Sequence, residues 1–578
     1  MVRYRIAIAD LHAHLYQVTL TIPQPDALQR VSLPVWIPGS YLVREFARHL
    51  SQVTARQGTR ELPVAAIDKA TWEVACSGRG ALELSYRVYA FDNSVRAAWL
   101  DAQRGFFNGT SLCLRVHGRE DQPHQVTLGR LPRGWEVATA MPAGDSAQTW
   151  KAANYDELID HPFELGPFWR GRFKAGGVAH EFVVAGAAAS FDGERLLADA
   201  RRICEAQIAF WHGKHKPPFK HYVFMLNAVE EGHGGLEHRA STALVAKRRD
   251  LPRLGQDKTA PASEGYVSLL GLISHEYFHT WNVKRLRPGE FASYDLTREN
   301  PTRLLWFFEG FTSYYDDLFL VRQRLIDPPQ YLRLLAATVN QVGATPGRQV
   351  SSVAQASFDA WIKYYRPDEN TANATVSYYT KGSLVALALD LTLRSEGRGT
   401  LDAVMRLLWT RSSGGPITED DIAAALQEVG GRSFAPELAD WVHGTSELPL
   451  QRLLEAVGVR WTHEAATLGL RLGARLNDGG NGLRVQAVMR GSAAEQAGLA
   501  AGDEVLALDG WRLRRLDDGA LVGALDHELP LLAARDQRLL HLTLPAAKVA
   551  GPVVLSQDGT AGAAPLRRRA AWLTADGE

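Results

Sequence analysis

The chain has 578 residues, a length that accommodates roughly three or four domains. Lysine plus arginine and aspartate plus glutamate number 64 each, so no net charge favours binding to nucleic acid or to an anionic membrane. No apolar stretch approaches the length of a membrane span, and the three cysteines supply neither a disulfide framework nor a metal-binding spacing.

Residues 1–170 alternate apolar and polar side chains with a period of two. The apolar members of the clearest runs are Tyr16, Val18, Leu20 and Ile22, then Leu82, Leu84, Tyr86 and Val88, then Leu112, Leu114 and Val116. Successive side chains of a strand point to opposite faces, so each run predicts a strand with one buried face. We therefore expect an antiparallel sheet domain in this part of the chain.

Residues 171–455 change to a mixed and then largely helical pattern. A long helix is predicted over 191–212, and the apolar run 222–226 predicts a buried strand. A glycine-rich motif, H-G-G-L-E-H at 233–238, follows that strand. Further helices are expected over 328–342, 382–395, 401–409 and 418–429.

The most informative motif reads H-E-Y-F-H at 275–279, in a proline-free stretch for which Ser263 is a candidate N-cap. Positions i and i+4 of a helix share a face, so His275 and His279 can reach one metal ion. Glu276 can then act as general base on a metal-bound water, an arrangement typical of peptide-bond hydrolysis. The alternatives are a chance match and two histidines that only pack against a core.

A catalytic zinc site needs a third protein ligand, usually a carboxylate for a helix of this kind, and a candidate stands about thirty residues later. Glu309 is the only acid in an apolar and aromatic run, and 300–302 (N-P-T) looks like the start of its helix. A buried carboxylate is costly without a cation or hydrogen-bond partners, and zinc is a natural partner. Asp316 lies two turns on and could accept the N–H of a zinc-bound histidine. The alternatives are a surface glutamate and a solvated aspartate.

The motif H-E-Y-F-H, followed by W-N-V-K-R-L-R-P at 281–288 and W-F-F-E-G-F at 306–311, resembles the glycyl aminopeptidase family of zinc metallopeptidases. That family belongs to the thermolysin-like gluzincin clan. The resemblance covers most of the chain and implies a multidomain α+β fold that binds Zn²⁺. It implies an N-terminal β-sandwich at 1–170 and a thermolysin-like catalytic domain with a helical lobe at 171–455.

The glycine-rich motif at 233–238 is similar to the G-x-M-E-N segment of clan aminopeptidases. By this resemblance Glu237 holds the free α-amino group of the substrate, and Gly234 and Gly235 let the edge strand approach the peptide. Leu236 replaces the methionine of that segment, and His238 replaces its asparagine. The alternative is a glycine-rich hairpin with an exposed acid.

The segment S-Y-Y-T-K-G at 377–382 resembles the Y-x-K-G element of the clan. The resemblance gives Tyr379, and not Tyr378, the role of stabilising the anionic oxygen of the transition state. A phenol donor can do so because the charge is larger in the transition state than in the ground state. A purely structural tyrosine at a helix start is the alternative.

Residues 460–548 are similar to a PDZ domain, on the run G-S-A-A-E-Q-A-G-L-A-A-G-D-E-V-L-A-L-D-G at 491–510. Such domains bind an extended peptide or a C-terminus at a sheet edge. The alternative is a domain that only packs on the rest of the chain. The tail at 549–578, rich in glycine and alanine and containing three consecutive arginines, is expected to be poorly ordered.

Together these features predict a zinc aminopeptidase that removes N-terminal residues from peptides with a free N-terminus, with a preference for glycine or alanine implied by the resemblance. A PDZ-coupled zinc endopeptidase and a non-catalytic PDZ adaptor on a peptidase scaffold are the alternatives. The few cysteines and the lack of a visible signal favour the cytoplasm. A signal peptide removed beforehand would instead be compatible with the periplasm.

Overall fold

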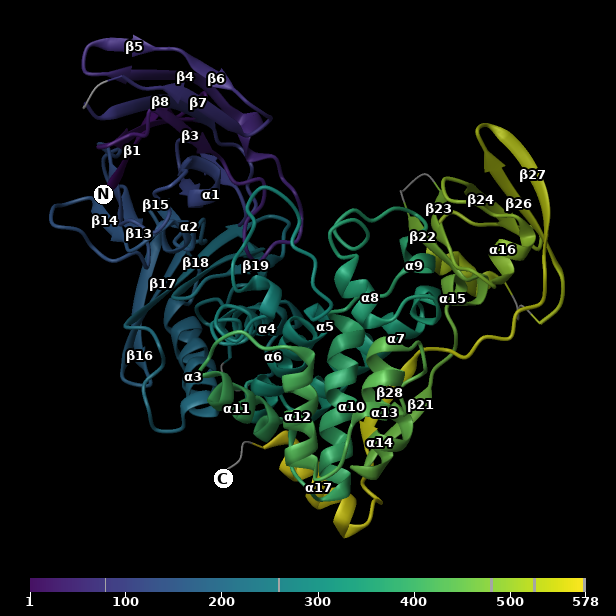
Figure 1. Cartoon of the computed structure of the whole chain (residues 1–578). Coiled ribbons are helices and arrows are strands. Elements are labelled where there is room, and N and C mark those ends of the chain that lie inside the picture. The colour runs from purple at the N-terminus through teal and green to yellow at the C-terminus, as the bar shows by residue number, and fades with distance from the viewer. Residues whose placement is uncertain (78–79, 258–259, 479–481, 523–525, 575–578) are drawn as a thin grey trace. The chain divides into compact units, whose positions relative to one another are not determined.

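The computed structural model describes residues 1–578 except 78–79, 258–259, 479–481, 523–525 and 575–578. The chain forms two compact units (Figure 1). The first comprises Met1–Asn300 and Trp409–Pro416, and the second comprises Pro301–Leu408 and Ile417–Glu578. Within the described residues, no helix has the length and apolar character needed to cross a membrane.

The N-terminal part of the first unit is built from sheets. The largest runs in the order β14-β12-β1-β2-β8-β4-β5, and two smaller ones in the orders β11-β3-β7-β6 and β13-β15-β10-β9. Their strands are β1 (Val2–Asp10), β2 (Leu15–Ile22), β3 (Leu28–Ser32), β4 (Leu50–Gln57), β5 (Arg60–Leu62), β6 (Val64–Ala66), β7 (Thr71–Ala75), β8 (Leu82–Tyr89), β9 (Ala98–Leu100), β10 (Gly105–Phe107), β11 (Arg115–Val116), β12 (His124–Leu128), β13 (Glu136–Ala138), β14 (Thr149–Ala152) and β15 (Phe163–Gly166). Two short helices, α1 (Gly109–Leu112) and α2 (Tyr155–Ile159), interrupt them.

The period-two pattern predicts β2 and β8 correctly. In both strands buried and partly exposed residues alternate, and the two strands pair antiparallel. The prediction of a continuous strand over the third run, from Leu112 to Val116, is wrong. Leu112 is the last residue of α1, and only Arg115–Val116 form a strand, β11. The leucines of this run are nevertheless buried, and the Asn108 amide fixes the turn before α1 by donating to the carbonyls of Val95 and Ala97. This contact between separate segments has no local signature.

The sheet of the catalytic region runs in the order β16-β17-β18-β20-β19. Its strands are β16 (Trp169–Ala175), β17 (Val178–Ala185), β18 (His221–Val229), β19 (Gly234–Glu237) and β20 (Ser241–Lys247). The run at 222–226 lies in β18 and is buried, as expected. Strand β19 pairs antiparallel with β20 and forms an edge of the sheet, while β17, β18 and β20 are parallel. Two long helices, α3 (Gly193–His212) and α4 (Glu264–Phe278), belong to the same unit.

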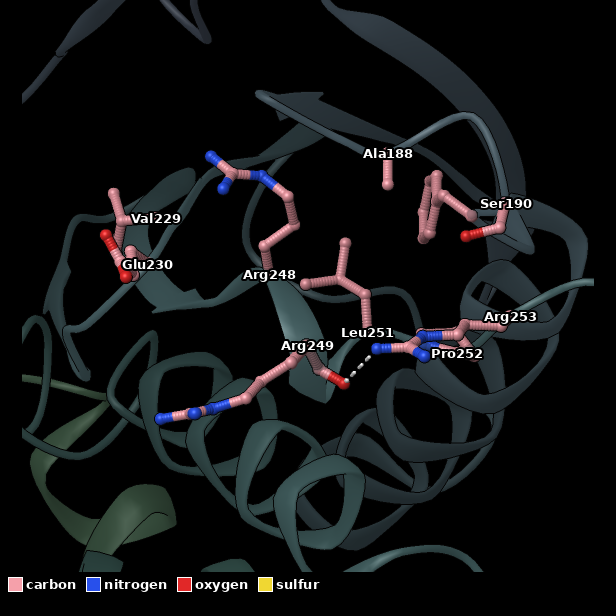
Figure 2. Close-up of a pocket in the computed structure, with 10 residues that line it drawn as sticks. Ala188, Ser190, Val229, Glu230, Arg248, Arg249, Leu251, Pro252 and Arg253 are labelled. Atoms are coloured by element: carbon pink, nitrogen blue, oxygen red, sulfur yellow. Dashed lines mark hydrogen bonds between the residues drawn. The ribbon is translucent and has the colours of Figure 1, made fainter.

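A cavity of about 290 Å³ lies where β17, β18 and β20 end (Figure 2). Arg248, Arg249 and Arg253 line it together with apolar side chains such as Leu251. The guanidinium of Arg248 donates to the carbonyls of Gly186 and Ala228, so it ties two strand ends together. None of the residues predicted for catalysis lines this cavity.

His180 connects this sheet to α4 and makes the stability of the first unit depend on pH. Its Nε2 lies 2.8 Å from the Tyr277 hydroxyl, and burial lowers the pKa of His180 from 6.5 to about 4. Because the folded pKa is the lower one, the stability from neutral His180 is complete above pH 6.5 and is lost as pH falls toward 4. We expect the free energy of unfolding to fall by about 2 kcal/mol at pH 5 through this group alone.

Thermal unfolding of metal-free protein at pH 7.5 and pH 5 measures this effect. The variant His180→Gln should show a smaller loss of stability between the two pH values than the wild type. His12→Gln, which replaces an exposed histidine, should leave the difference unchanged. An identical pH dependence in wild type and His180→Gln would contradict the prediction.

The second unit contains a helical lobe. Its helices are α5 (Leu305–Phe308), α6 (Gly310–Arg322), α7 (Pro328–Gly343), α8 (Val353–Phe358), α9 (Thr371–Ala374), α10 (Thr380–Glu396), α12 (Glu419–Gly430), α13 (Ala435–Leu438) and α14 (Leu450–Ala456); α11 (Leu401–Ser412) is divided between the two units. The helix with Glu309 was expected to begin near Pro301 but begins at Leu305. Its free N–H at Trp306 donates to the hydroxyl of Ser357, which comes from α8, a tertiary cap that the sequence does not reveal.

The region resembling a PDZ domain folds as a separate sheet in the order β22-β23-β24-β26-β27, with β25 paired to β24. Its elements are α15 (Leu468–Leu472), β22 (Ala474–Asp478), β23 (Leu483–Val488), α16 (Ala493–Ala497), β24 (Glu504–Leu508), β25 (Trp511–Arg512), β26 (Leu529–Arg535) and β27 (Arg538–Leu544). Outside this sheet, β21 (Val459–His463) pairs antiparallel with β28 (Val553–Gln557). The chain therefore enters and leaves the region through two paired strands.

The described part of the C-terminal tail forms regular secondary structure, contrary to the expectation from its composition. After β28 it forms α17 (Ala563–Leu573), and Trp572 is completely buried. The Trp572 indole N–H donates to the Tyr314 hydroxyl, and its carbonyl accepts from Arg322. The tail has few large apolar side chains, but the burial of Trp572 removes a large apolar area from water and so stabilises the folded tail.

Candidate metallopeptidase site

Helix α4 carries the H-E-Y-F-H motif in its last turn. The helix begins as predicted, since the Ser263 hydroxyl accepts a hydrogen bond from the backbone N–H of Tyr266 at 3.2 Å. The Nε2 atoms of His275 and His279 lie 3.0 Å apart. The i, i+4 spacing therefore brings both imidazoles together on one face.

The tautomer of the His279 imidazole is set by the contact of its Nδ1 atom. His279 Nδ1 lies 2.7 Å from the carbonyl oxygen of Asn282, which can only accept, so Nδ1 carries the hydrogen. In a neutral ring this leaves the lone pair on Nε2, the atom that faces His275. His279 is therefore prepared to bind a metal ion through its Nε2 atom.

The loop after α4 is held by several side chains of the W-N-V-K-R-L motif. Trp281 donates its indole N–H to His212 at 2.7 Å, and Arg285 donates to the carbonyls of Thr280 and Arg239. Val283 has a φ of 107°, a strained conformation for a β-branched residue. The motif thus fixes the carbonyl of Asn282 that orients His279.

Glu276 and the edge strand β19 are in direct contact. Glu276 is buried, and a Cβ atom built on Gly235 would overlap its carboxylate. Gly235 is therefore needed to admit Glu276, a reason different from the substrate contact implied by the resemblance. At Gly234 the requirement is conformational, because its φ is 148°.

Glu237 is 4% exposed, which excludes the alternative of an exposed acid on a hairpin. A Cβ atom on Gly39 would lie 2.5 Å from Glu237 Oε1 and 2.7 Å from Oε2. Gly39 also has a φ of 97°, so its position requires glycine on both counts. Sequence reasoning missed Gly39, whose only signal is a glycine in the aromatic turn W-I-P-G-S-Y at 36–41.

Glu309 stands at the junction of α5 and α6 and is 2% exposed, so it is not a surface glutamate. Two glycines bring this junction against the start of α10. A Cβ atom on Gly310 would lie 2.6 Å from the Gly382 Cα, and one on Gly382 would lie 2.6 Å from the carbonyl oxygen of Trp306. The glycines of the E-G-F and Y-x-K-G motifs thus allow backbone-to-backbone packing.

Tyr379 precedes the first residue of α10, and its hydroxyl lies 3.2 Å from that of Tyr365. Burial, and then the charge of Glu309, raise the pKa of Tyr379 well above its ordinary value. The phenol is therefore protonated at neutral pH and can donate a hydrogen bond. Tyr378 is completely buried, and its ring packs 4.7 Å from that of Tyr379.

His275, His279 and Glu309 form a group that could hold a metal ion, since their ligand atoms all lie within 4.8 Å of one another. Two imidazole nitrogens and one carboxylate oxygen are a donor set that suits zinc. Asp316 lies on α6, partly buried, and accepts the backbone N–H of Asp317 at 2.6 Å. Support of a metal ligand by Asp316 remains a prediction.

Three family models match parts of this chain. The Peptidase M61 N-terminal domain matches residues 3–167, the M61 glycyl aminopeptidase family matches 268–385, and the PDZ domain matches 462–526. An M1 zinc metallopeptidase from Deinococcus radiodurans is similar at 15% identity over 78% of this chain and 94% of that chain, with a TM-score of 0.45. Comparison with curated proteins gives no match.

A solved structure is similar to this chain over its whole length. It is that of an aminopeptidase N family protein from Idiomarina loihiensis, with 37% identity, coverage of 100% of both chains and a TM-score of 0.93. Together with the two M61 matches, this similarity assigns the family. The chain belongs to the M61 glycyl aminopeptidase family of metallopeptidases.

Proposed function

We propose that the chain is a zinc-dependent aminopeptidase that removes single residues from peptides with a free N-terminus, preferring glycine or alanine. The observation that carries the proposal is the edge strand β19. Gly235 and Glu237 are two residues apart and share one face of the strand, roughly 7 Å apart along it. Since Gly235 adjoins Glu276, Glu237 lies about one substrate residue from the proposed base.

In the proposed reaction, His275, His279 and Glu309 would hold zinc, which when bound would supply Lewis acidity to polarise the scissile carbonyl and activate water. Glu276 takes a proton from the attacking water and passes it to the leaving amine. The protonated phenol of Tyr379 donates a hydrogen bond to the developing oxyanion. Glu237 holds the substrate ammonium, a charge-assisted contact that sets the register.

We also propose that the PDZ region binds the extended or C-terminal segment of a peptide. Asn373, on α9, supports a connection between that region and the lobe, since its amide donates to the carbonyl of Val488 and accepts from the backbone N–H of Arg490. The endopeptidase alternative would use this region to deliver tails to the catalytic residues. Cleavage of N-blocked peptides would favour that alternative.

Aminopeptidase action is tested by comparing glycyl-p-nitroanilide with its N-acetylated form. We expect hydrolysis of the free amine to exceed that of the blocked form by about 10²-fold or more, because Glu237 binds only a cationic amine. Glu237→Gln should raise KM for the substrate with a free amine. It should also lower the ratio of the hydrolysis rates of the free and the N-acetylated substrate. Equal rates for the two substrates with wild-type enzyme would exclude the role of Glu237.

A matched control is Glu231→Gln, which removes an exposed carboxylate from the loop before β19. This change should leave the ratio between the two substrates unaltered. The preference for glycine or alanine is checked with a library of aminoacyl-p-nitroanilides. Similar hydrolysis rates for all members of that library would contradict the proposed preference for glycine or alanine. They would not contradict the aminopeptidase proposal.

A further inference from the structure

The free edge of β19 carries a contact from the N-terminal part of the chain. Strand β19 pairs with β20 on one side, and its other side is an edge of the sheet. Arg96, in the loop between β8 and β9, donates a hydrogen bond from Nη2 to the carbonyl oxygen of Gly235 at 3.1 Å. The same loop contacts β18, where the Asn227 amide donates to Asn93 Oδ1 at 2.8 Å. Gly235 also adjoins Glu276, so Arg96 binds the strand at the level of the proposed base.

The carbonyl of Gly235 points away from β20. In an antiparallel pair, the backbone groups of successive residues point alternately toward the partner strand and away from it. The backbone N–H of His238 donates to the carbonyl of Ser241 at 2.9 Å. The carbonyl of Leu236 accepts from the Thr242 hydroxyl at 3.0 Å. Positions 236 and 238 therefore face β20, and the backbone groups of positions 235 and 237 face the free edge, where an added peptide strand would form its hydrogen bonds.

The loop that presents Arg96 is held in place on both sides of this residue. The Asn108 side-chain amide donates to the carbonyls of Val95 and Ala97 at 3.0 and 3.2 Å. The backbone N–H of Arg96 donates to Ser94 Oγ at 3.3 Å. Val95 and Ala97 are buried. The backbone of Arg96 is therefore fixed by its neighbours in a position from which the side chain reaches β19.

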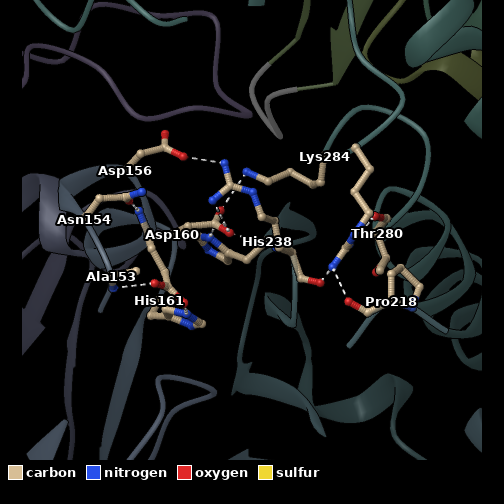
Figure 3. A network of polar contacts seen from close by, with 12 residues as sticks. Ala153, Asn154, Asp156, Asp160, His161, Pro218, His238, Thr280 and Lys284 are labelled. Atoms are coloured by element: carbon tan, nitrogen blue, oxygen red, sulfur yellow. Dashed lines mark hydrogen bonds and ion pairs between the residues drawn. The ribbon is translucent and has the colours of Figure 1, made fainter. Parts of the chain in front are cut away.

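The end of β19 is held in place as well (Figure 3). Asp160, which follows α2, accepts the backbone N–H of Arg239 at 3.0 Å and forms an ion pair with Lys284 Nζ at 2.8 Å. Lys284 lies in the loop after α4, so these contacts join the N-terminal part of the chain, β19 and that loop. The strand and the loop of Arg96 are thus both fixed to the same N-terminal sheets.

Arg96 uses little of its hydrogen-bonding capacity within the described part of the chain. A guanidinium has five N–H donors. Among the residues that the structure describes, the side chain of Arg96 makes the one hydrogen bond to Gly235 and no ion pair, and its Nε is buried without a partner. Arg104, by contrast, binds the buried Glu164 carboxylate at 2.7 Å. A guanidinium in the state of Arg96 is costly to cover with a further N–H donor or an apolar group.

The position of this guanidinium matters for a peptide that adds antiparallel to the edge. When the scissile carbonyl lies beside Glu276, the residue to be removed lies opposite Gly235, and its nitrogen faces the Gly235 carbonyl. In an N-terminal residue that nitrogen is the free amine. In a longer chain it is an amide, whose N–H would pair with the Gly235 carbonyl while the preceding residue continues along the edge.

We propose that Arg96 is a specificity-determining residue that closes the free edge of β19 at Gly235 and so excludes peptides that extend past the residue to be removed. This inference rests on the proposed aminopeptidase function. Arg96 already donates to the carbonyl that a longer chain needs, and its guanidinium stands in the path of the preceding residue. Selection for chain ends then has a repulsive element, in addition to recognition of the amine.

The test is the variant Arg96→Ala, assayed with glycyl-p-nitroanilide and with acetyl-glycyl-glycyl-p-nitroanilide, whose chain extends past the residue next to the anilide. We expect the ratio of kcat/KM for the blocked substrate to that for the free substrate to rise about tenfold or more. Arg96→Lys keeps a cationic donor and should stay within about threefold of the wild-type ratio. Arg5→Ala removes an exposed arginine of β1 and should leave the ratio unchanged.

A purely structural link between Arg96 and β19 predicts that Arg96→Ala loses activity toward both substrates in proportion. An unchanged ratio would therefore overturn the proposal. If Arg96→Ala does not fold, Arg96→Gln decides, because glutamine is shorter and neutral but can still donate a hydrogen bond. Its ratio should rise about threefold or more, and a wild-type ratio would contradict the proposal. Melting temperature and bound zinc are measured for every variant.

Failure of this inference can be distinguished from failure of the proposed function. A wild-type enzyme that cleaves the blocked and the free substrate equally well would exclude both. If the wild type selects the free amine but Arg96→Ala leaves the ratio unchanged, only the inference fails. The variants also differ in the substrate that they affect: Glu237→Gln should slow hydrolysis of the free substrate, whereas Arg96→Ala should accelerate hydrolysis of the blocked one.

Discussion

Substitution of Glu276 by glutamine is expected to lower kcat for glycyl-p-nitroanilide by about 10³-fold, with metal content unchanged. Glutamine has nearly the same shape but cannot take a proton from water. Because Gly235 leaves room for the Glu276 side chain against β19, the neutral replacement fits the same space. Steady-state kinetics and zinc analysis of the purified variant measure both parts of the prediction.

The matched control for this variant is Glu264→Gln, which changes an exposed glutamate in the first turn of the same helix. It should retain wild-type kcat. Removal of metal with a chelator should abolish hydrolysis in the wild type, and added zinc should restore it. A Glu276→Gln enzyme with bound zinc and more than about a tenth of wild-type kcat would exclude Glu276 as the general base.

Substitution of Tyr379 by phenylalanine is expected to lower kcat by about 10²-fold while KM changes little. A donor that acts on the developing oxyanion stabilises the transition state and not the bound substrate, so its loss appears in kcat. The raised pKa of Tyr379, due to burial and then to Glu309, keeps its hydrogen in place across the neutral range. The effect should therefore be independent of pH between about 6 and 8.

Tyr378→Phe is the control for Tyr379→Phe, because the two tyrosines are adjacent and their rings are packed together. It should keep kcat within about threefold of the wild type. If Tyr378→Phe has the larger effect on kcat, the assignment within the Y-Y pair is reversed. If neither change alters kcat, the oxyanion has another donor.

The sequence was sufficient where the signal is local. The helix of His275 and His279 and its N-cap at Ser263 follow from spacing and capping within one segment. Glu309 was recognisable because an acid in an aromatic run has to be compensated, and it is indeed buried. The edge position of β19 is the one that the resemblance to the clan aminopeptidases implied for this segment.

The parts that could not be predicted depend on contacts between distant segments. The approach of Gly39 to Glu237 and the ion pair of Asp160 with Lys284 each join residues more than 100 positions apart. In sequence, Asp160 is an ordinary acid after a short helix, with no apolar surroundings to mark it. The start of α5 is similar, since its cap is supplied by Ser357 from another helix.

The C-terminal tail shows the limit of composition as a guide. Glycine, alanine and arginine predict weak order on average, yet the fate of a short segment depends on one or two contacts. Trp572 fills a fully buried site beside Tyr314, and Arg322 binds its carbonyl. A single tryptophan among thirty residues hardly changes the composition of the tail, but its burial contributes strongly to the stability of the folded tail.

The pairing of β21 with β28 means that the PDZ region is an insertion and not an appendage. His463 and Val553 are direct partners across the two strands, so the chain leaves the lobe and returns to it at neighbouring positions. The Asn340 side chain holds the returning strand by bonding both the N–H and the carbonyl of Val553. Such a cassette could be gained, lost or exchanged during evolution without moving the helices around it, because a short turn suffices to close the gap.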